Sequence, residues 1–400
     1  MIENHMNISS DNFSRVLCAL LLCVGLILTS CEEFPFFDGE NSEQNGNGNT
    51  GGENVGGENT GDNEYAGSSD GAANCYIISE VGLYKFKTVK GNSDTSVGNA
   101  SSAEVLWESF GTDVTPNVGD LIKWVAYKDG YIAFQTADTF KEGNAVIAVK
   151  DASGNILWSW HIWLTDQPRG QEYYNNAGTM MDRNLGATSA TPGDVETFGL
   201  FYQWGRKDPF LGSSSNGTPT FANSTITWPS VVKSDSSNGT IEYAVSHPTT
   251  FIVRNERNYD WYYTGDERVA NTRWTTADKT KSIYDPCPAG WRVPDGGDNG
   301  VWSKACGSSS DFSSYHYDSL NNGMNFSGKF GSDQTIWYPA SSYLIDYSCE
   351  FYDIISYGAW WSASSDGYYI YNLNLGSNNI VRLSGNDHRA DGRSVRCIRE

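Results

Sequence analysis

Short stretches of alternating apolar and polar residues, separated by turns containing Gly, Asn and Asp, recur in the middle of this chain. Residues 83–87 alternate in this way, as a strand with one buried face does. Residues 121–127 and 131–134 flank a Lys-Asp-Gly turn, and residues 145–149 and 156–164 flank an Asp-Ala-Ser-Gly-Asn turn. Both arrangements predict β-hairpins, and no 3.6-residue periodicity competes with them. The sequence therefore predicts a mainly β fold.

Residues 73–165 form the first predicted folded module. Roughly seven short strands in about 90 residues are typical of an immunoglobulin-like sandwich. In the last of these strands Ile156, Trp158, Trp160 and Ile162 share one face. Tryptophans in a sandwich strand usually pack in the core, so we interpret them as packing residues rather than as a ligand platform.

The N-terminus has the features of an export signal. The apolar, uncharged run at residues 16–28 is too short to cross a bilayer, which needs about 20 residues, but it suits a signal peptide. It ends in Leu-Thr-Ser-Cys, which resembles a bacterial lipobox, so residues 1–30 are expected to be a lipoprotein signal peptide and Cys31 the lipidated residue. An ordinary signal peptide with a chance cysteine is the alternative. Glu32 and Glu33 resemble a surface-export signal of Bacteroidetes lipoproteins, which implies an outer-membrane protein facing the cell exterior.

The segment after this signal is acidic and rich in Gly and Asn. Residues 32–74 contain acidic residues but no Lys or Arg, and such a stretch cannot bury enough apolar surface to offset its ordering entropy. Residues 31–72 are therefore expected to be a disordered tether. The net charge of −21 also argues against a nucleic-acid partner, which needs a basic face.

Five motifs mark the second predicted module, residues 170–400. In order they read MDRNLGA (181–187), GLFYQWGR (199–206), YDPCPAGWRVP (284–294), WWSAS (360–364) and RADGRSVRC (389–397). This set resembles the major paralogous domain family first named from Fibrobacter succinogenes and found in lipoproteins of gut Bacteroidetes. The resemblance implies a loop-rich α+β domain, similar to C-type lectins and formylglycine-generating enzymes. A helix is expected over residues 299–306, and residues 212–250 have the texture of a long surface insertion.

The resemblance also suggests a disulfide. Cys287 and Cys397 occupy the family's two cysteine-bearing motifs, and pairing them would tie the C-terminus to the middle of the module. Cys75 is then expected to be a buried free thiol. A bond between Cys306 and Cys349 is a guess, and the alternative is that all of these cysteines are reduced.

The sequence offers no recognisable catalytic motif. Formylglycine-generating enzymes use a closely spaced cysteine pair, which this chain lacks, so we expect neither enzymatic activity nor a cofactor. Two acidic clusters, Asp295 with Asp298 and Asp387 with Asp391, could in principle bind calcium, but such clusters more often form turns, and no metal site is predicted.

Aromatic residues late in the chain are the candidate ligand contacts. Trp360, Trp361 and Tyr368 lie on neighbouring predicted strands, where one face must be core and the other could offer rings to a ligand. We expect a non-catalytic surface lipoprotein that adheres to a glycan or to a surface protein through its C-terminal module. The alternatives are a fimbrial or surface-assembly subunit and, less favoured, an enzyme of the formylglycine-generating type.

The lipid anchor is directly testable. Replacing the acylated residue, Cys31→Ala, should abolish labelling with a fatty-acid analogue and release the protein from the membrane fraction, because the thiol is the attachment point. Retention of the unlabelled variant in the membrane fraction would contradict the assignment. Protease shaving of whole cells tests separately whether the protein faces outward.

Overall fold

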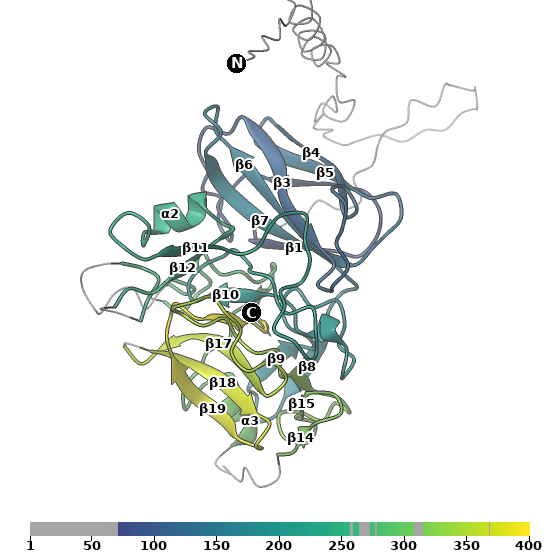
Figure 1. The fold of residues 1–400 in the computed structure, drawn as a ribbon, viewed down its shortest axis with the longest axis vertical. Coiled ribbons are helices and arrows are strands. Elements are labelled where there is room, and N and C mark those ends of the chain that lie inside the picture. The colour runs from purple at the N-terminus through teal and green to yellow at the C-terminus, as the bar shows by residue number, and fades with distance from the viewer. Residues whose placement is uncertain (1–70, 257–258, 264–272, 277, 308–314, 368) are drawn as a thin grey trace, which may run out of the picture. The chain divides into compact units, whose positions relative to one another are not determined.

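The computed structural model of the chain describes residues 71–256, 259–263, 273–276, 278–307, 315–367 and 369–400. These residues lie in one compact unit, Glu64–Glu400. The fold is mainly β, as predicted, and its described residues include two short α-helices, α2 (Ile241–Ser246) and α3 (Val301–Cys306) (Figure 1). The predicted signal peptide, Cys31 and nearly all of the predicted tether lie outside the described residues.

The first seven strands form two sheets that enclose a common core. The predicted hairpins are confirmed, and the turn between β4 and β5 has positive φ angles at both Asp129 (51°) and Gly130 (81°), the conformation of a tight type I′ turn. One sheet has the order β1-β7-β6-β3 and the other β2-β5-β4. The strands are β1 (Cys75–Ile78), β2 (Leu83–Lys87), β3 (Ser102–Ser109), β4 (Ile122–Lys128), β5 (Tyr131–Thr136), β6 (Gly143–Lys150) and β7 (Ile156–Leu164).

The two faces of β7 pack into different parts of the protein. Trp158, Trp160 and Ile162 face the core between the two sheets, as the alternating pattern predicts. Trp163 points the other way, into a second core cluster that also contains Tyr202 and Trp361 from the C-terminal half. The segments predicted as separate modules therefore share a continuous hydrophobic core.

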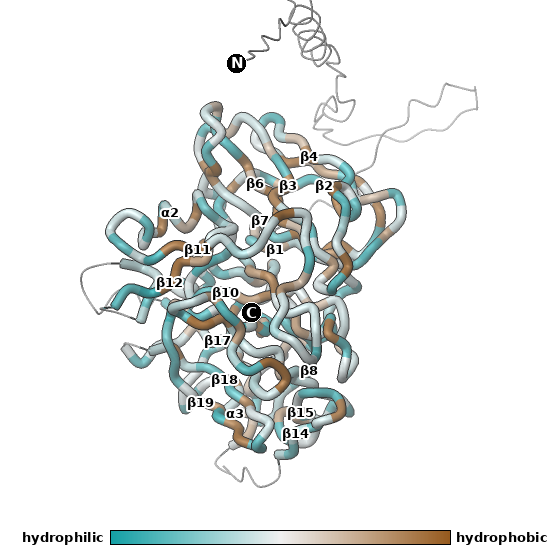
Figure 2. Tube along the Cα trace, in the orientation of Figure 1, coloured by the Kyte–Doolittle hydropathy of each residue, from teal (hydrophilic) through white to brown (hydrophobic). Residues whose placement is uncertain are grey.

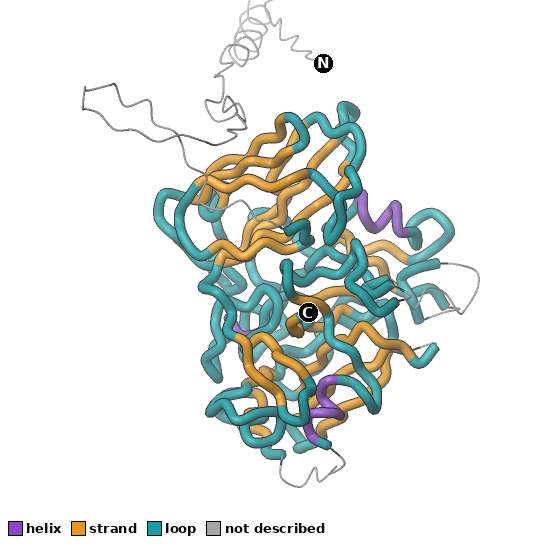
Figure 3. The backbone as a smooth tube through the Cα atoms, turned by 180° about the vertical axis from the view of Figure 1, so that it is seen from behind, coloured by secondary structure: helices purple, strands orange, loops and turns teal. Residues whose placement is uncertain are grey.

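The C-terminal half consists of several small sheets joined by loops, which Figure 3 shows from behind. A five-stranded sheet has the order β10-β20-β17-β18-β19, and a four-stranded sheet has the order β13-β21-β9-β8. The strands of these two sheets are β8 (Gly170–Tyr173), β9 (Gly178–Met181), β10 (Phe201–Gln203), β13 (Trp291–Arg292), β17 (Tyr357–Ser365), β18 (Ile370–Gly376), β19 (Val381–Asp387), β20 (Gly392–Ser394) and β21 (Ile398–Arg399).

Two smaller sheets and the helices complete this half. The smaller strands are β11 (Ser230–Lys233), β12 (Thr250–Val253), β14 (Tyr317–Asp318), β15 (Gly323–Asn325) and β16 (Trp337–Pro339), and a 3₁₀-helix covers Val195–Thr197. Figure 2 shows β11 and β12 as hydrophobic segments, and β12 is buried along its whole length. Helix α3 lies inside the predicted range and begins after Gly300, whose extended backbone (φ −72°, ψ 170°) is not helical.

The predicted surface insertion, residues 212–250, contacts the sandwich. Thr225 exchanges hydrogen bonds with the end of β3, because its backbone N–H donates to the Glu108 carbonyl and its hydroxyl accepts from the Glu108 N–H (both 3.0 Å). Asn223 donates to the Asp113 carbonyl (2.6 Å). The segment therefore packs on the first sheet as well as carrying β11 and α2.

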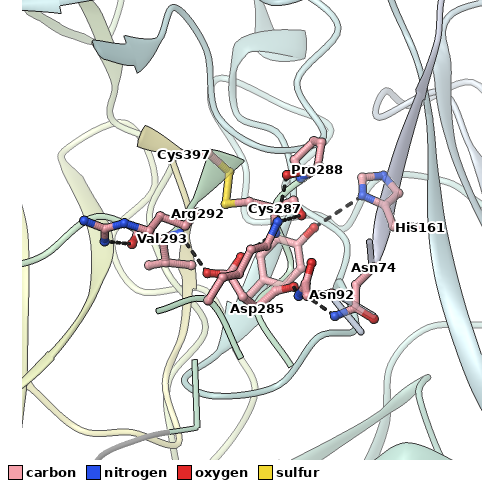
Figure 4. Close-up of a disulfide and its surroundings, with 11 residues drawn as sticks. Asn74, Asn92, His161, Asp285, Cys287, Pro288, Arg292, Val293 and Cys397 are labelled. Atoms are coloured by element: carbon pink, nitrogen blue, oxygen red, sulfur yellow. Dashed lines mark hydrogen bonds between the residues drawn. A yellow bond between two sulfur atoms is a disulfide. The ribbon is translucent and has the colours of Figure 1, made fainter. Parts of the chain in front are cut away.

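The predicted disulfide between Cys287 and Cys397 is confirmed (Figure 4). Both cysteines are fully buried, 110 residues apart in sequence. Cys75 is a buried free thiol, also as predicted. Neither Cys306 nor Cys349 is in a disulfide, so the suggested bond between them does not form.

Asp285 connects the sandwich to the region of the bridge. Its carboxylate accepts hydrogen bonds from the N–H groups of Cys287 (2.8 Å) and Val293 (2.9 Å), and its carbonyl accepts one from the Asn74 side chain (2.9 Å). Figure 4 shows these residues together. Burial raises the pKa of Asp285 to about 6. The residue before β1 is thereby fixed to the loop that carries the disulfide.

Removing the bridge should lower the free energy of unfolding. Closing a loop of this length stabilises a fold by about 4–5 kcal/mol in the chain-entropy model, so the double variant Cys287→Ala/Cys397→Ala should unfold at a much lower urea concentration. Cys349→Ala, at a buried free thiol, is the matched control and should cost less. Equal losses in the two variants would show that the bridge adds nothing beyond packing.

His161 should make the protein sensitive to acid. The ring lies between the Asn144 side-chain oxygen (2.9 Å from Nε2) and the Tyr202 hydroxyl (3.5 Å from Nδ1), and burial lowers its pKa from 6.5 to about 3. The unfolded chain therefore binds the proton first, and stability falls as the pH drops below 6.5, by about 2 kcal/mol between pH 7 and pH 5. Urea unfolding of His161→Gln should lack this decrease, whereas the exposed His247→Gln should keep it.

Candidate functional site

The sequence-predicted ligand contacts Trp360 and Trp361 are not on the surface. Both side chains have an exposed fraction of 0%, so their assignment as ligand contacts is wrong. Strand β17 lies inside its sheet between β18 and β20, and both of its faces are covered by protein. The third candidate, Tyr368, lies outside the described residues.

The two tryptophans instead connect sequence motifs inside the core. The Trp360 indole N–H donates to the Asn184 side-chain oxygen (2.8 Å), and the Trp361 indole N–H donates to the Tyr202 carbonyl (2.8 Å). Arg396 also donates to the Asn184 oxygen (3.1 Å). Buried hydrogen bonds therefore link the first motif to the fourth and fifth motifs, and the second motif to the fourth.

In both acidic clusters considered for calcium, carboxylates form ion pairs with arginine side chains. Asp295 pairs with Arg292 (2.8 Å), and Asp387 and Asp391 both pair with Arg393 (2.8 Å each). Within the described ranges there is no group of three or more His, Cys, Asp or Glu side chains that could hold a metal ion.

A hydroxyl, an amine and a carboxylate meet at Ser159, Lys207 and Asp208. The Lys207 ammonium donates to the Ser159 hydroxyl (2.5 Å) and to the Asp208 carboxylate (2.6 Å), and the Ser159 hydroxyl donates to Asp208 (2.6 Å). Burial lowers the pKa of Lys207. All three side chains are buried where β7 contacts the C-terminal half, so a substrate cannot reach them.

A surface cluster of aromatic and basic side chains is the candidate site. We call it the His388 patch; it consists of Arg254, Tyr259, Tyr347, Tyr369 and His388. Tyr347 has an exposed fraction of 62% and Tyr259 one of 42%, both large for an aromatic residue. Exposed aromatic rings that gather around a charged group are typical of recognition surfaces.

The rings of the patch contact one another closely. Tyr259 stacks on His388 with ring centres 4.0 Å apart and ring planes at 13°. Tyr369 lies 5.7 Å from His388 and 6.0 Å from Tyr259. The Arg254 guanidinium carbon lies 5.0 Å from the centre of the Tyr259 ring and 5.8 Å from that of Tyr347. Stacking and cation–π contacts thus hold the patch together.

A buried carboxylate fixes the two nitrogenous side chains. Asp346, whose side chain is 3% exposed, lies with Oδ2 2.6 Å from Nε of Arg254 and 2.8 Å from Nδ1 of His388. The buried Asp346 carboxylate therefore positions the Arg254 guanidinium and the His388 ring. The terminal nitrogens of Arg254 and Nε2 of His388 do not contact this carboxylate and can face a ligand.

Backbone contacts bring the segments of the patch together. Arg254, directly after β12, donates its N–H to the Asp346 carbonyl (2.7 Å). The Asp346 N–H donates to the Asp391 carboxylate (3.1 Å), and the Ala390 N–H donates to the Tyr259 carbonyl (3.1 Å). Because four parts of the chain that are distant in sequence form the patch, no local sequence motif predicts it. The one signal in the sequence is the density of tyrosines around residues 343–357 and 368–371.

Chemically, this arrangement is suited to binding a ligand. It offers flat rings, phenolic hydroxyls and N–H donors, and it contains no nucleophile positioned against a base. The described residues include no helix with the length and apolar character needed to cross a bilayer.

Comparison with known proteins gives no match to a family model, a curated protein or a solved structure. The resemblance to the major paralogous domain family therefore rests on the five motifs alone.

Proposed function

We propose that this protein is a non-catalytic, surface-exposed lipoprotein that recognises a glycan through the His388 patch. The observation that carries the proposal is the pair of exposed tyrosines, Tyr259 and Tyr347, whose ring centres lie 5.0 Å and 5.8 Å from the Arg254 guanidinium carbon. The lectin-like character implied by the motifs agrees with it.

The chemistry of the patch suits a sugar. The apolar C–H face of a pyranose ring can pack on a tyrosine ring, while the surrounding hydroxyls need hydrogen-bond partners. Tyrosine supplies both an apolar face and a polar end at low cost in side-chain entropy. The stacked and paired state of the patch keeps its rings ordered before a ligand arrives, which lowers the entropic cost of binding.

The N-terminal sequence features support a location of this surface at the cell exterior. In this proposal Cys31 carries the lipid in the outer membrane, and the segment 31–72 is the tether. A flexible chain of this length has an end-to-end distance of about 30–40 Å, enough to hold the folded unit off the membrane.

One observation favours a second candidate, a subunit of a surface assembly. A cavity of about 320 Å³ opens beside β1, an edge strand of its sheet, and is lined by aromatic residues that include Tyr84, Phe86 and Phe134. An extended segment of another chain could add to such an edge. Concentration-dependent polymerisation of the purified protein would favour this candidate over glycan recognition.

Glycan binding can be tested on an array with the full-length protein in detergent micelles. Tyr347→Ala should weaken binding at least about tenfold, because truncating a central aromatic hot spot costs about 2 kcal/mol or more. Tyr174→Ala is the control, since Tyr174 is an exposed tyrosine outside the patch, with an exposed fraction (40%) close to that of Tyr259 (42%). Binding that survives Tyr347→Ala and Tyr259→Ala equally would place the glycan elsewhere.

A further inference from the structure

We infer that the glycan recognised by the His388 patch carries a carboxylate, as uronic and sialic acids do, and that Arg254 binds this group. The inference rests on the proposed function and adds the chemical class of the sugar. It follows from the state of the Arg254 guanidinium.

Arg254 is held at one nitrogen and available at the others. Its Nε faces buried Asp346 at 2.6 Å, and 25% of its side chain is exposed. Among the described residues, neither terminal nitrogen, Nη1 or Nη2, has a hydrogen-bond partner. A guanidinium can bind one carboxylate through its Nε edge and present its remaining N–H groups to another acceptor.

The neighbours of Arg254 are arranged to keep this group in place. Tyr259 and Tyr347 lie within cation–π distance of the guanidinium, and its backbone N–H is fixed to the Asp346 carbonyl. A planar, pre-positioned pair of N–H donors matches the two oxygens of a carboxylate better than it matches scattered hydroxyls. The tyrosine rings beside it would hold the sugar ring that carries the acid.

The surrounding charges leave Arg254 as the attractive group. Exposed Glu256 pairs with Lys233 (3.0 Å), and Asp391 pairs with Arg393 (2.8 Å). His388 shares Asp346 with Arg254 through Nδ1, so its Nε2 is a second nitrogen at the edge of the patch. The Arg254 guanidinium is therefore the group of the patch that would attract an acidic sugar, although the chain as a whole carries −21.

Matched pairs of sugars test this inference. The full-length protein in detergent micelles is titrated with trigalacturonic acid and its carboxyl-reduced form, and with sialyllactose and lactose. The acidic member of at least one pair should bind about tenfold or more tightly than its neutral partner, the range for hydrogen bonds to charged groups. Arg254→Gln should remove the difference in affinity between the acidic and the neutral sugar. Arg254→Lys keeps the positive charge but lacks the paired N–H donors of the guanidinium, so it should retain a reduced preference for the acidic sugar.

Arg292→Gln is the matched control, because Arg292 has a similar exposure (21%), pairs with Asp295 and lies outside the patch. Thermal unfolding verifies that the Arg254 variants remain folded. Equal binding of acidic and neutral sugars that is lost in Tyr347→Ala would overturn the carboxylate inference and leave glycan recognition intact. Binding of an acidic peptide but of none of the four sugars would overturn both.

Discussion

The side chain of Asn184 connects the parts of the C-terminal half in a way that no other side chain could easily replace. It is fully buried, donates to the carbonyls of Thr197 and Phe198, and accepts from Trp360 and Arg396. An aspartate would lack the N–H donors, and a leucine would leave several buried polar groups without partners, at about 1–3 kcal/mol each. In a fold with short strands and long loops, such a buried network supplies the order that extended sheets provide elsewhere.

The same principle joins the sandwich to the C-terminal half. Asn74 donates to two carbonyls of the 283–285 loop and accepts from the Trp158 indole, and Trp163 inserts into the cluster that contains the disulfide. The sandwich and the C-terminal half are each long enough to form an independent domain. The shared core makes residues 73–165 and 170–400 depend on each other for burial, so the sandwich and the His388 patch are parts of one folded body.

Local patterns predicted local structure well and surface properties poorly. Alternation and turn residues are properties of neighbouring residues, so strands β2, β4, β5, β6 and β7 and the turn at Asp129 followed from the sequence. The disulfide came with the motif resemblance. The assignment of Trp360 and Trp361 failed because alternation tells which residues share a face but not whether the second face is covered. The His388 patch escaped prediction because Arg254, Tyr259, Tyr347 and His388 are brought together only by tertiary contacts.

The error over Trp361 has a physical connection to the patch. The Arg393 guanidinium packs 5.0 Å from the centre of the Trp361 ring and pairs with Asp391, whose carboxylate accepts from the Asp346 N–H. Asp346 in turn fixes Arg254 and His388. The fifth motif thus belongs to the core on one side and supports the patch on the other. A substitution at Trp361 would therefore disturb the patch through three intervening residues, and a loss of the proposed binding in such a variant would not make the Trp361 ring a contact. A direct contact must instead be argued from exposure, which Tyr347 has and Trp361 lacks.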